Sequence, residues 1–224
     1  MTLTIHTDLV QRSDEWYAAR LGMVTASSVG KLITPKTVAV ANNPDSRRLA
    51  FTLAAERITG WSETNYVSED MWRGIEDEPI ARAKYSEHHA PATEAGFMVE
   101  DKFGFKLGYS PDGLVGDDGL IEVKSRRPKA HLETILDDAP PIDCMAQLQC
   151  GLLVSGRAWI DYVSYAGGLP LWVKRVEPQQ KWFDTILAAV GAIESSIADM
   201  IRLYTESVAG LPMTERRLID EMVV

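Results

Sequence analysis

The chain has 224 residues, of which 46% are hydrophobic, and a formal net charge of −9. This length and apolar content suffice for one sizeable core, and no stretch approaches the roughly 20 consecutive apolar residues of a membrane span. The acidic balance differs from the basic footprint that is usual for nucleic-acid binders, but the basic residues are grouped, and a small basic groove on an acidic body remains compatible with DNA.

The amino end lacks the basic region and apolar core of a secretory signal, so we expect no such signal. The two cysteines, Cys144 and Cys150, lie six residues apart in a helix-like segment. This arrangement favours two reduced, buried cysteines over a disulfide. We therefore expect a cytoplasmic protein without a membrane partner.

Helical patterns dominate the first third of the chain. One helix is predicted to begin at Asp14, its candidate cap, and to end near residue 20, and another to run from Asp45, again as a cap, to about residue 59. The remaining predictions for this third are a short helix over 27–33, a loop over 34–44 and a long helix over 68–89 that continues through Pro79.

From about residue 93 the pattern changes to the alternation that is typical of strands. Strands are predicted at 97–99, 105–109, 114–115, 120–124, 158–165 and 171–176, with helices at about 129–138 and 143–154 between them. A long amphipathic helix follows at about 179–206, and a last short helix is predicted to begin at Thr214.

This order of elements predicts an α/β (α+β) fold in which a central mixed β-sheet is flanked by helices. We expect a single domain over residues 1–224, with a helical N-terminal third, a sheet at about 93–177 and C-terminal helices at about 179–222.

The stretch Ser110-Pro111-Asp112-Gly113-Leu114, followed by Leu120-Ile121-Glu122-Val123-Lys124, carries the strongest chemical signal. Side chains alternate along a strand, so Glu122 and Lys124 are predicted on one face and Ile121 and Val123 on the other. The turn-forming residues 116–119 between the two stretches predict a β-hairpin that brings Asp112 beside Glu122.

The register of this hairpin decides whether the two carboxylates meet. A turn centred between Asp117 and Asp118 would pair Asp112 with Val123 rather than with Glu122. A loop of odd length, or a bulge at Gly119, places Asp112 opposite Glu122 instead, and we predict such an irregularity.

Two carboxylates and a backbone carbonyl form the all-oxygen ligand set that Mg²⁺ prefers. A neighbouring lysine can position or deprotonate a water molecule, or stabilise charge on a phosphate in the transition state. Asp112, Glu122 and Lys124 therefore predict phosphodiester hydrolysis, although the same pattern also fits an exposed hairpin with a surface ion pair.

Two further segments offer candidate site residues. Glu78 lies in the acid-dense first half of a predicted helix, where acids ordinarily complement the helix dipole, but one of them could be a third acid of the site. Gln147 and Gln149 lie on an otherwise apolar helix, and we expect Gln147 to face a polar site and Gln149 to face solvent.

The segment from Arg20 to Ser28 joins the end of one predicted helix to the start of another and is rich in hydroxyl groups. Free backbone N–H groups, hydroxyls and an arginine can receive a phosphate, and simple helix capping by Ser27 would use the same residues. The glycine-rich loops that bind nucleotide phosphates and the G-x-S-x-G motif are both absent from the sequence.

These motifs, taken in order, resemble the phage lambda exonuclease family, also called the YqaJ-type viral recombinases, of the restriction-endonuclease-like superfamily. The resemblance extends from about Trp16 to Gln149 and consists of five ordered blocks. The blocks are Trp16, Arg20, Gly22 and Val24–Ser27; Gly74, Glu78 and Ala81-Arg82; Ser110–Leu114; Glu122 and Lys124; and Ala146–Gln149.

The resemblance implies a restriction-endonuclease-like core and assigns roles by position. Asp112 and Glu122 would bind Mg²⁺ with the Val123 carbonyl, and Lys124 would activate the attacking water. Glu78 and Gln147 would complete and orient this catalytic shell. The residues expected to hold the 5′-phosphate end of DNA are Arg20, Thr25, Ser27 and Ser110. The chain departs from the best-known member of the family at Cys144, where that member has an aromatic residue, and in details of residues 34–65.

The resemblance also implies an activity: Mg²⁺-dependent 5′→3′ digestion of one strand of double-stranded DNA to mononucleotides, which leaves a 3′ overhang. Mn²⁺ is expected to substitute for Mg²⁺. Implied partners are DNA ends, a single-strand annealing protein and further copies of the chain in a ring-shaped trimer, in the cytoplasm of a bacterium that carries the phage or prophage. The alternatives are an endonuclease of the same superfamily and a catalytically silent DNA-binding recombination scaffold.

Overall fold

The computed structural model describes residues 3–63 and 68–216 of the chain. The helices are α1 (Asp14–Arg20), α2 (Ala26–Val29), the 3₁₀ turn η1 (Gly30–Leu32), α3 (Pro44–Thr59), α4 (Glu69–His88), α5 (Pro128–Leu136), α6 (Ile142–Ser155) and α7 (Gln180–Ser207). The strands are β1 (Thr4–His6), β2 (Val24–Thr25), β3 (Ile33–Thr34), β4 (Ala39–Val40), β5 (Ala92–Thr93), β6 (Phe97–Glu100), β7 (Leu107–Tyr109), β8 (Gly113–Val115), β9 (Gly119–Ser125), β10 (Trp159–Tyr165) and β11 (Trp172–Val176).

The strands form two main sheets. A four-stranded sheet has the order β1-β6-β7-β2, a five-stranded sheet has the order β11-β10-β9-β8-β5, and β3 and β4 make a small separate hairpin. The five-stranded sheet is mixed, because β9 and β10 are parallel while its other pairs are antiparallel. Parallel neighbours need a crossover connection, which α5 and α6 supply.

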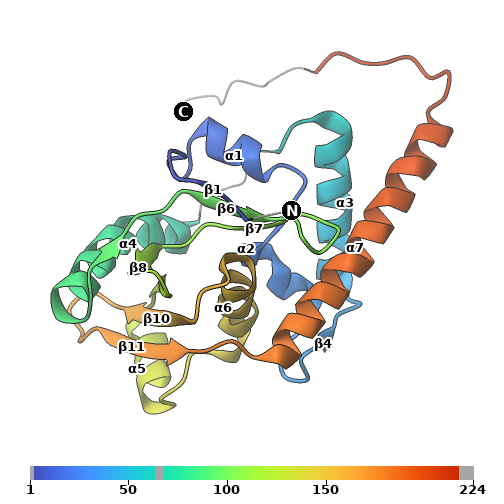
Figure 1. Cartoon of the computed structure of the whole chain (residues 1–224). Coiled ribbons are helices and arrows are strands. Elements are labelled where there is room, and N and C mark those ends of the chain that lie inside the picture. Colours follow the sequence, from blue (N-terminus) through green and yellow to red (C-terminus); the bar gives the residue numbers. More distant parts are fainter. Residues whose placement is uncertain (1–2, 64–67, 217–224) are drawn as a thin grey trace.

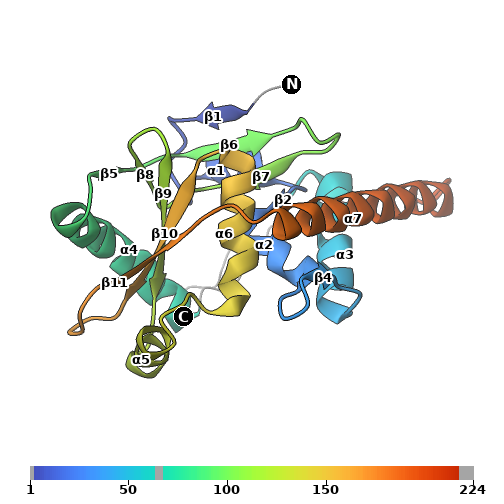
Figure 2. The ribbon, with the colours of Figure 1, turned by 60° about the horizontal axis from the view of Figure 1, so that its bottom comes forward.

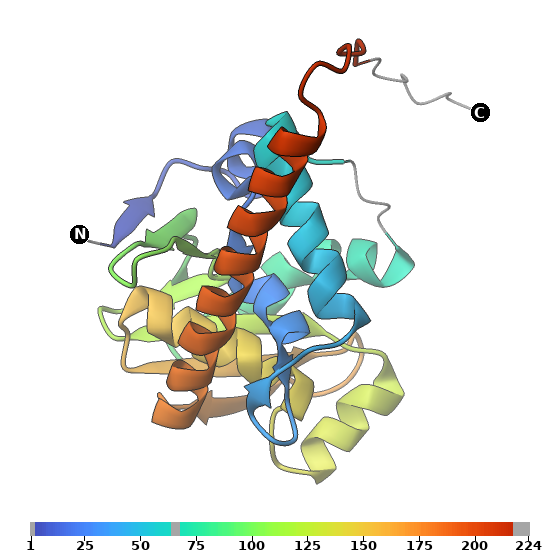
Figure 3. The same cartoon turned by 90° about the vertical axis from the view of Figure 1, so that its right-hand side faces the viewer.

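Helices cover both faces of the five-stranded sheet (Figure 1). Helix α4 packs against β9 and β10 on one face, and α6 contacts β10 on the other. Helix α6 also contacts β6 and β7, so it stands between the two sheets (Figure 2). Helices α3 and α7 pack side by side at the edge of this arrangement (Figure 3).

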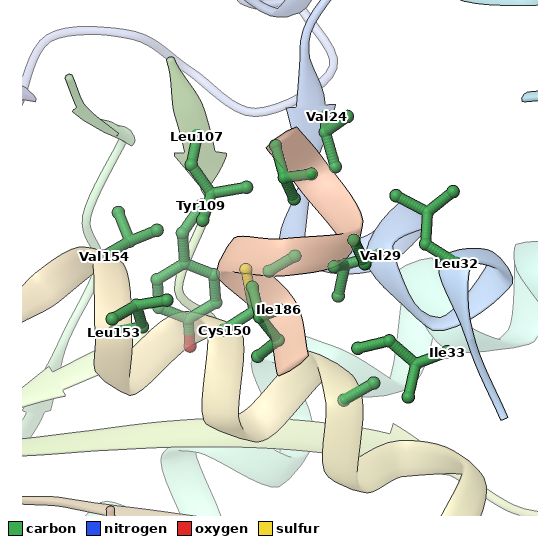
Figure 4. Close-up of a cluster of buried hydrophobic side chains, with 14 of the residues drawn as sticks. Val24, Val29, Leu32, Ile33, Leu107, Tyr109, Cys150, Leu153, Val154 and Ile186 are labelled. Atoms are coloured by element: carbon green, nitrogen blue, oxygen red, sulfur yellow. The ribbon is translucent and has the colours of Figure 1, made fainter. Parts of the chain in front are cut away.

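The main hydrophobic core gathers around α6. Figure 4 shows the ring of Tyr109, from β7, lying against α6 close to Cys150 and Leu153. This approach depends on Gly151, because a Cβ atom there would come within 2.7 Å of the Tyr109 ring. Both cysteines are free, as predicted, and burial raises the pKa of the Cys150 thiol.

Most long elements lie where the sequence predicts them, and the differences have local causes. The caps of α1 and α3 are Ser13 and Asn43 rather than Asp14 and Asp45, since each accepts a hydrogen bond from a backbone N–H in the first turn. Strands β1 to β5 have only two or three residues each, too few to show an alternating pattern.

The C-terminal prediction is corrected in part. Residues 211–216 form no helix, so the helix expected to begin at Thr214 is not present there, and its remainder lies outside the described residues. Within the part of the chain that the structure describes, every helix is too short or too polar to cross a membrane.

Candidate active site

Strand β9 presents its catalytic candidates on one face, as the alternation predicts. Glu122 and Lys124 lie on the side of α6, where Lys124 Nζ is 2.9 Å from Gln147 Oε1. Ile121 and Val123 lie on the other side and pack with Ala81 and Tyr85 of α4. The strand is thus fixed by apolar contacts on one face while its other face carries charge.

The β8–β9 hairpin has the odd loop that the carboxylates require. Val115 pairs with Gly119 across the three residues 116–118, and Gly113 pairs with Ile121. Gly116 has a φ of 51°, which glycine adopts without strain. Continuing this register by one pair sets Asp112 opposite Glu122, so the predicted irregularity is confirmed.

Asp112 lies just before β8, and its carboxylate turns toward β9. Its Oδ2 accepts a hydrogen bond of 2.7 Å from the Val123 N–H. The N–H and C=O of a strand residue point to the same side, so the Val123 carbonyl also faces Asp112. Burial raises the pKa of Asp112 well above its usual range, and the negative charges of Glu122 and Glu78 raise it further.

Glu122 is buried, with 2% of its side chain exposed, and three side chains surround it. Its Oε1 accepts hydrogen bonds from Lys124 Nζ, at 2.8 Å, and from the Gln147 side-chain amide. The Tyr109 hydroxyl lies 3.4 Å from Oε2. The structure therefore brings Glu122, Lys124 and Gln147 together as the sequence predicts.

Two opposing influences act on Lys124. Burial favours the neutral amine and would by itself lower its pKa, but the carboxylates of Glu122 and Asp112 outweigh burial and raise the pKa. Lys124 is therefore an ammonium donor in this structure. If another positive charge neutralised the two carboxylates, burial would remain as the main influence on Lys124 and would favour its neutral amine form.

Glu78 lies near this cluster but bonds to arginines. Its two carboxylate oxygens accept hydrogen bonds of 3.0 Å from Arg12 and from Arg82. Its charge contributes to the raised pKa of Asp112. A cavity of about 290 Å³ adjoins it, lined among others by Gln11, Arg12, Glu78 and Pro111.

Gln149 corrects one expectation. It is fully buried instead of facing solvent. Its amide donates a 2.8 Å hydrogen bond to the Glu177 carbonyl, and its oxygen accepts one of 2.8 Å from the Gln179 N–H. Gln149 thus fixes the chain before α7 against α6, a structural role that the sequence pattern does not reveal.

The four residues predicted to hold a 5′-phosphate converge on one point. The Arg20 guanidinium donates to the hydroxyls of Ser110 at 3.3 Å, Thr25 at 3.4 Å and Ser27 at 3.1 Å. Burial lowers the pKa of Arg20 to about 10, partly opposed by Tyr17 and Glu56, so the side chain stays charged at neutral pH. A half-buried cation ringed by hydroxyl groups is suited to an anion.

Trp16 supports this pocket, a role that the sequence analysis does not assign to it. The Arg20 guanidinium lies 3.9 Å from the centre of the Trp16 ring, a cation–π contact. The Trp16 Nε1–H donates a 2.9 Å hydrogen bond to the Ser110 hydroxyl. Trp16 and Arg20 are four residues apart on α1, and this helical spacing was the available signal.

The residues fit a hard divalent cation. Among the described residues no group of three or more His, Cys, Asp or Glu side chains is placed so that it could hold a metal ion. Mg²⁺ does not require such a group, because it commonly binds one or two carboxylates and keeps several waters. The Asp112 and Glu122 carboxylates and the Val123 carbonyl supply such an open oxygen set, and the pKa of Asp112 is raised first by burial and then by the charges of Glu122 and Glu78.

Comparisons with known proteins identify relatives in sequence and in fold. A model of the YqaJ-like viral recombinase domain matches residues 15–158. The crystal structure of an alkaline exonuclease from Laribacter hongkongensis is 34% identical, with a TM-score of 0.79, and the match covers 89% of this chain and 100% of that chain. The structure of the same exonuclease in complex with dAMP matches to the same extent.

A more distant match shows the fold alone. It is a phage related exonuclease from Haemophilus somnus 129PT, 12% identical, with a TM-score of 0.65 over 83% of this chain and 96% of that chain. None of the curated proteins matches. Together with the α/β architecture, the likeness to the Laribacter exonuclease shows a restriction-endonuclease-like fold.

Proposed function

The chain belongs to the YqaJ-like viral recombinase family, and on this premise we propose that it is a Mg²⁺-dependent 5′→3′ exonuclease of double-stranded DNA. It would release mononucleotides from the 5′-ended strand and leave 3′ overhangs for recombination by single-strand annealing. The likeness to an alkaline exonuclease supports the nuclease activity. The convergence of Asp112, Glu122 and Lys124 is the observation that carries the proposal.

We propose a role for each residue of the site, in keeping with the family resemblance. Asp112, Glu122 and the Val123 carbonyl would hold the cation, which when bound polarises the scissile phosphate and lowers the pKa of water. Lys124 would orient and deprotonate the attacking water, and Gln147 keeps Lys124 and Glu122 in place through hydrogen bonds to both. Glu78 would complete the shell from α4.

The pocket around Arg20 supports action at a 5′ end. Ser110 belongs to this pocket and is only two residues before Asp112, so their Cα atoms are at most about 7 Å apart. A terminal 5′-phosphate held by Arg20, Thr25, Ser27 and Ser110 would therefore lie close to the acids. Such closeness favours removal of nucleotides one at a time from that end.

The remaining parts of the proposal extend the family resemblance. The partners would be double-stranded DNA ends and a single-strand annealing protein, in the cytoplasm of a phage- or prophage-carrying bacterium, and Mn²⁺ would substitute for Mg²⁺. The chain would form a ring-shaped trimer. Native mass measurement checks the assembly, with three chains of 24.8 kDa each as the expected result.

The experiment compares a linear duplex with a closed circular duplex of the same sequence, with Mg²⁺ and with a chelator, using the wild type and Lys124→Ala. We expect Mg²⁺-dependent loss of the linear duplex alone, and a fall in kcat of about 100- to 10,000-fold for Lys124→Ala with DNA binding retained. Cleavage of the circle would indicate an endonuclease. Binding without digestion would indicate a DNA-binding scaffold.

A further inference from the structure

One arginine joins the segments that carry the acids of the site. Arg82, on α4, has only 12% of its side chain exposed. Its Nη1 donates to Glu78 Oε1 at 3.0 Å and to the backbone carbonyl of Asp112 at 2.6 Å. Its Nη2 donates to the carboxylate of Glu94. A single planar guanidinium thus links a helix, the chain entering β8 and the segment before β6.

Asp112 is held from two sides by these contacts. It precedes the first paired residue of β8, Gly113, so it lies where the ladder with β9 ends. Its carboxylate is fixed by the Val123 N–H and its carbonyl by Arg82. The bond to Arg82 therefore limits rotation of the backbone that would turn the carboxylate away from Glu122.

Glu78 accepts a hydrogen bond from the same Nη1 atom of Arg82. It lies one helical turn before Arg82 on α4, where an i,i+4 pair stabilises a shared orientation. The acid and the Asp112 backbone are bound by the same Nη1 atom, so the spacing between Glu78 and Asp112 is set by one rigid group. Lysine, a point charge on a flexible stem, cannot reproduce this fork.

We infer that Arg82 is a positioning residue of the acid site, which sets Asp112 and Glu78 relative to each other so that the site is preorganised for a divalent cation. This inference rests on the proposed function. It assigns Arg82 no contact with substrate. Residues that orient metal ligands typically contribute about 10- to 100-fold to metal affinity or activity when they are removed.

Arg157, at the opposite end of the β8–β9 hairpin, provides a matched control variant. Arg157 also donates to two backbone carbonyls, those of Gly116 at 2.9 Å and Gly119 at 2.6 Å. It holds the turn of the same β8–β9 hairpin but makes no hydrogen bond to the carboxylates of the site. Arg157→Ala therefore removes hairpin contacts of the same chemical kind without disturbing the acids.

The test titrates Mn²⁺ into the metal-free protein without DNA, by calorimetry, for the wild type, Arg82→Ala, Arg82→Lys and Arg157→Ala. We expect Mn²⁺ affinity about 10- to 100-fold weaker in Arg82→Ala, a smaller loss in Arg82→Lys, and a change within about twofold in Arg157→Ala. Digestion assays on the same proteins should show a higher Mg²⁺ requirement for Arg82→Ala, with the preference for 5′-phosphorylated ends unchanged.

Two results would overturn the inference: wild-type Mn²⁺ affinity in Arg82→Ala, or an equal loss in Arg157→Ala, which would indicate general loosening of the hairpin. Arg82→Lys decides the matter if Arg82→Ala does not fold, because full wild-type affinity there would exclude a need for the fork. Failure of the proposed function is distinguishable, since it appears as a wild type that binds Mn²⁺ and does not digest DNA.

Discussion

At the scale of single residues, Asp112 combines a cost in stability with a role in the proposed chemistry. Its folded-state pKa is raised, first by burial and then by Glu122 and Glu78. Below about pH 4, the ordinary pKa of aspartate, both folded and unfolded states are protonated and no cost arises. As the pH rises above that value the unfolded state ionises more readily than the folded state, so the folded state is disfavoured.

Asp112→Asn removes this cost and should therefore stabilise the metal-free protein at pH 7 while abolishing digestion. The Tm measured with a chelator should rise by about 2 to 4 °C for each kcal/mol regained, and the difference from wild type should shrink toward pH 4. Adding Mg²⁺ should raise the Tm of the wild type but not of the variant. A variant less stable than the wild type at pH 7 would contradict the origin assigned to the raised pKa.

Arg20 is expected to determine the preference for 5′-phosphorylated ends. Its guanidinium bonds three hydroxyl groups and is the charged group of the phosphate pocket. A charge-assisted hydrogen bond contributes about 1.5 to 3 kcal/mol, so Arg20→Ala should reduce the preference for 5′-phosphorylated over 5′-hydroxyl ends by about tenfold or more. The measurement is the ratio of kcat/KM on the two ends, and Arg48→Ala, an exposed arginine, is the control. An equal loss on both ends would exclude the pocket.

At the scale of elements, the close contact of α6 with β7 positions two residues of the site. Helix α6 supplies Gln147, and β7 supplies Tyr109. A methyl group at Gly151 would come within 2.7 Å of the Tyr109 ring. Helix propensity favours Ala over Gly by about 1 kcal/mol, whereas overpacking a core costs about 1 to 3 kcal/mol. The steric cost should prevail.

Gly151→Ala should therefore lower the free energy of unfolding, and Gly74→Ala is its counterpart. Gly74 lies inside α4, and a Cβ atom there meets nothing within 4 Å. That substitution should stabilise by about 1 kcal/mol through propensity alone. Urea unfolding of both variants makes the comparison, and stabilisation by Gly151→Ala would show that Tyr109 can move away without loss.

The elements also show what the sequence alone can predict. The faces of β9 follow from alternation, which is local, whereas the odd hairpin loop is predicted from the requirement that Asp112 meets Glu122; both are confirmed. The bonds from Arg82 to Asp112 and from Trp16 to Ser110 join positions 30 and 94 residues apart, and no local pattern encodes them. The division of the strands into two sheets likewise depends on how α6 packs between them.

At the scale of the whole molecule, the acidic composition does not exclude the proposed DNA substrate, because basic side chains belong to the proposed site. The net charge is −9, yet Arg20 and Lys124 are gathered with the residues that would meet DNA. An acidic exterior repels a polyanion from other surfaces, so it would favour entry of DNA at this one place. A trimeric ring, if formed, would add a geometric restriction of the same kind.

The most direct test is a timed digestion of a linear duplex that carries different labels at the 5′ and 3′ ends of one strand, with Mg²⁺ present. A 5′→3′ exonuclease should release the 5′ label first, as a mononucleotide, while the 3′ label remains in a shortening strand, and Lys124→Ala should release neither. Earlier release of the 3′ label, or release of the 5′ label in long fragments, would contradict the proposed activity.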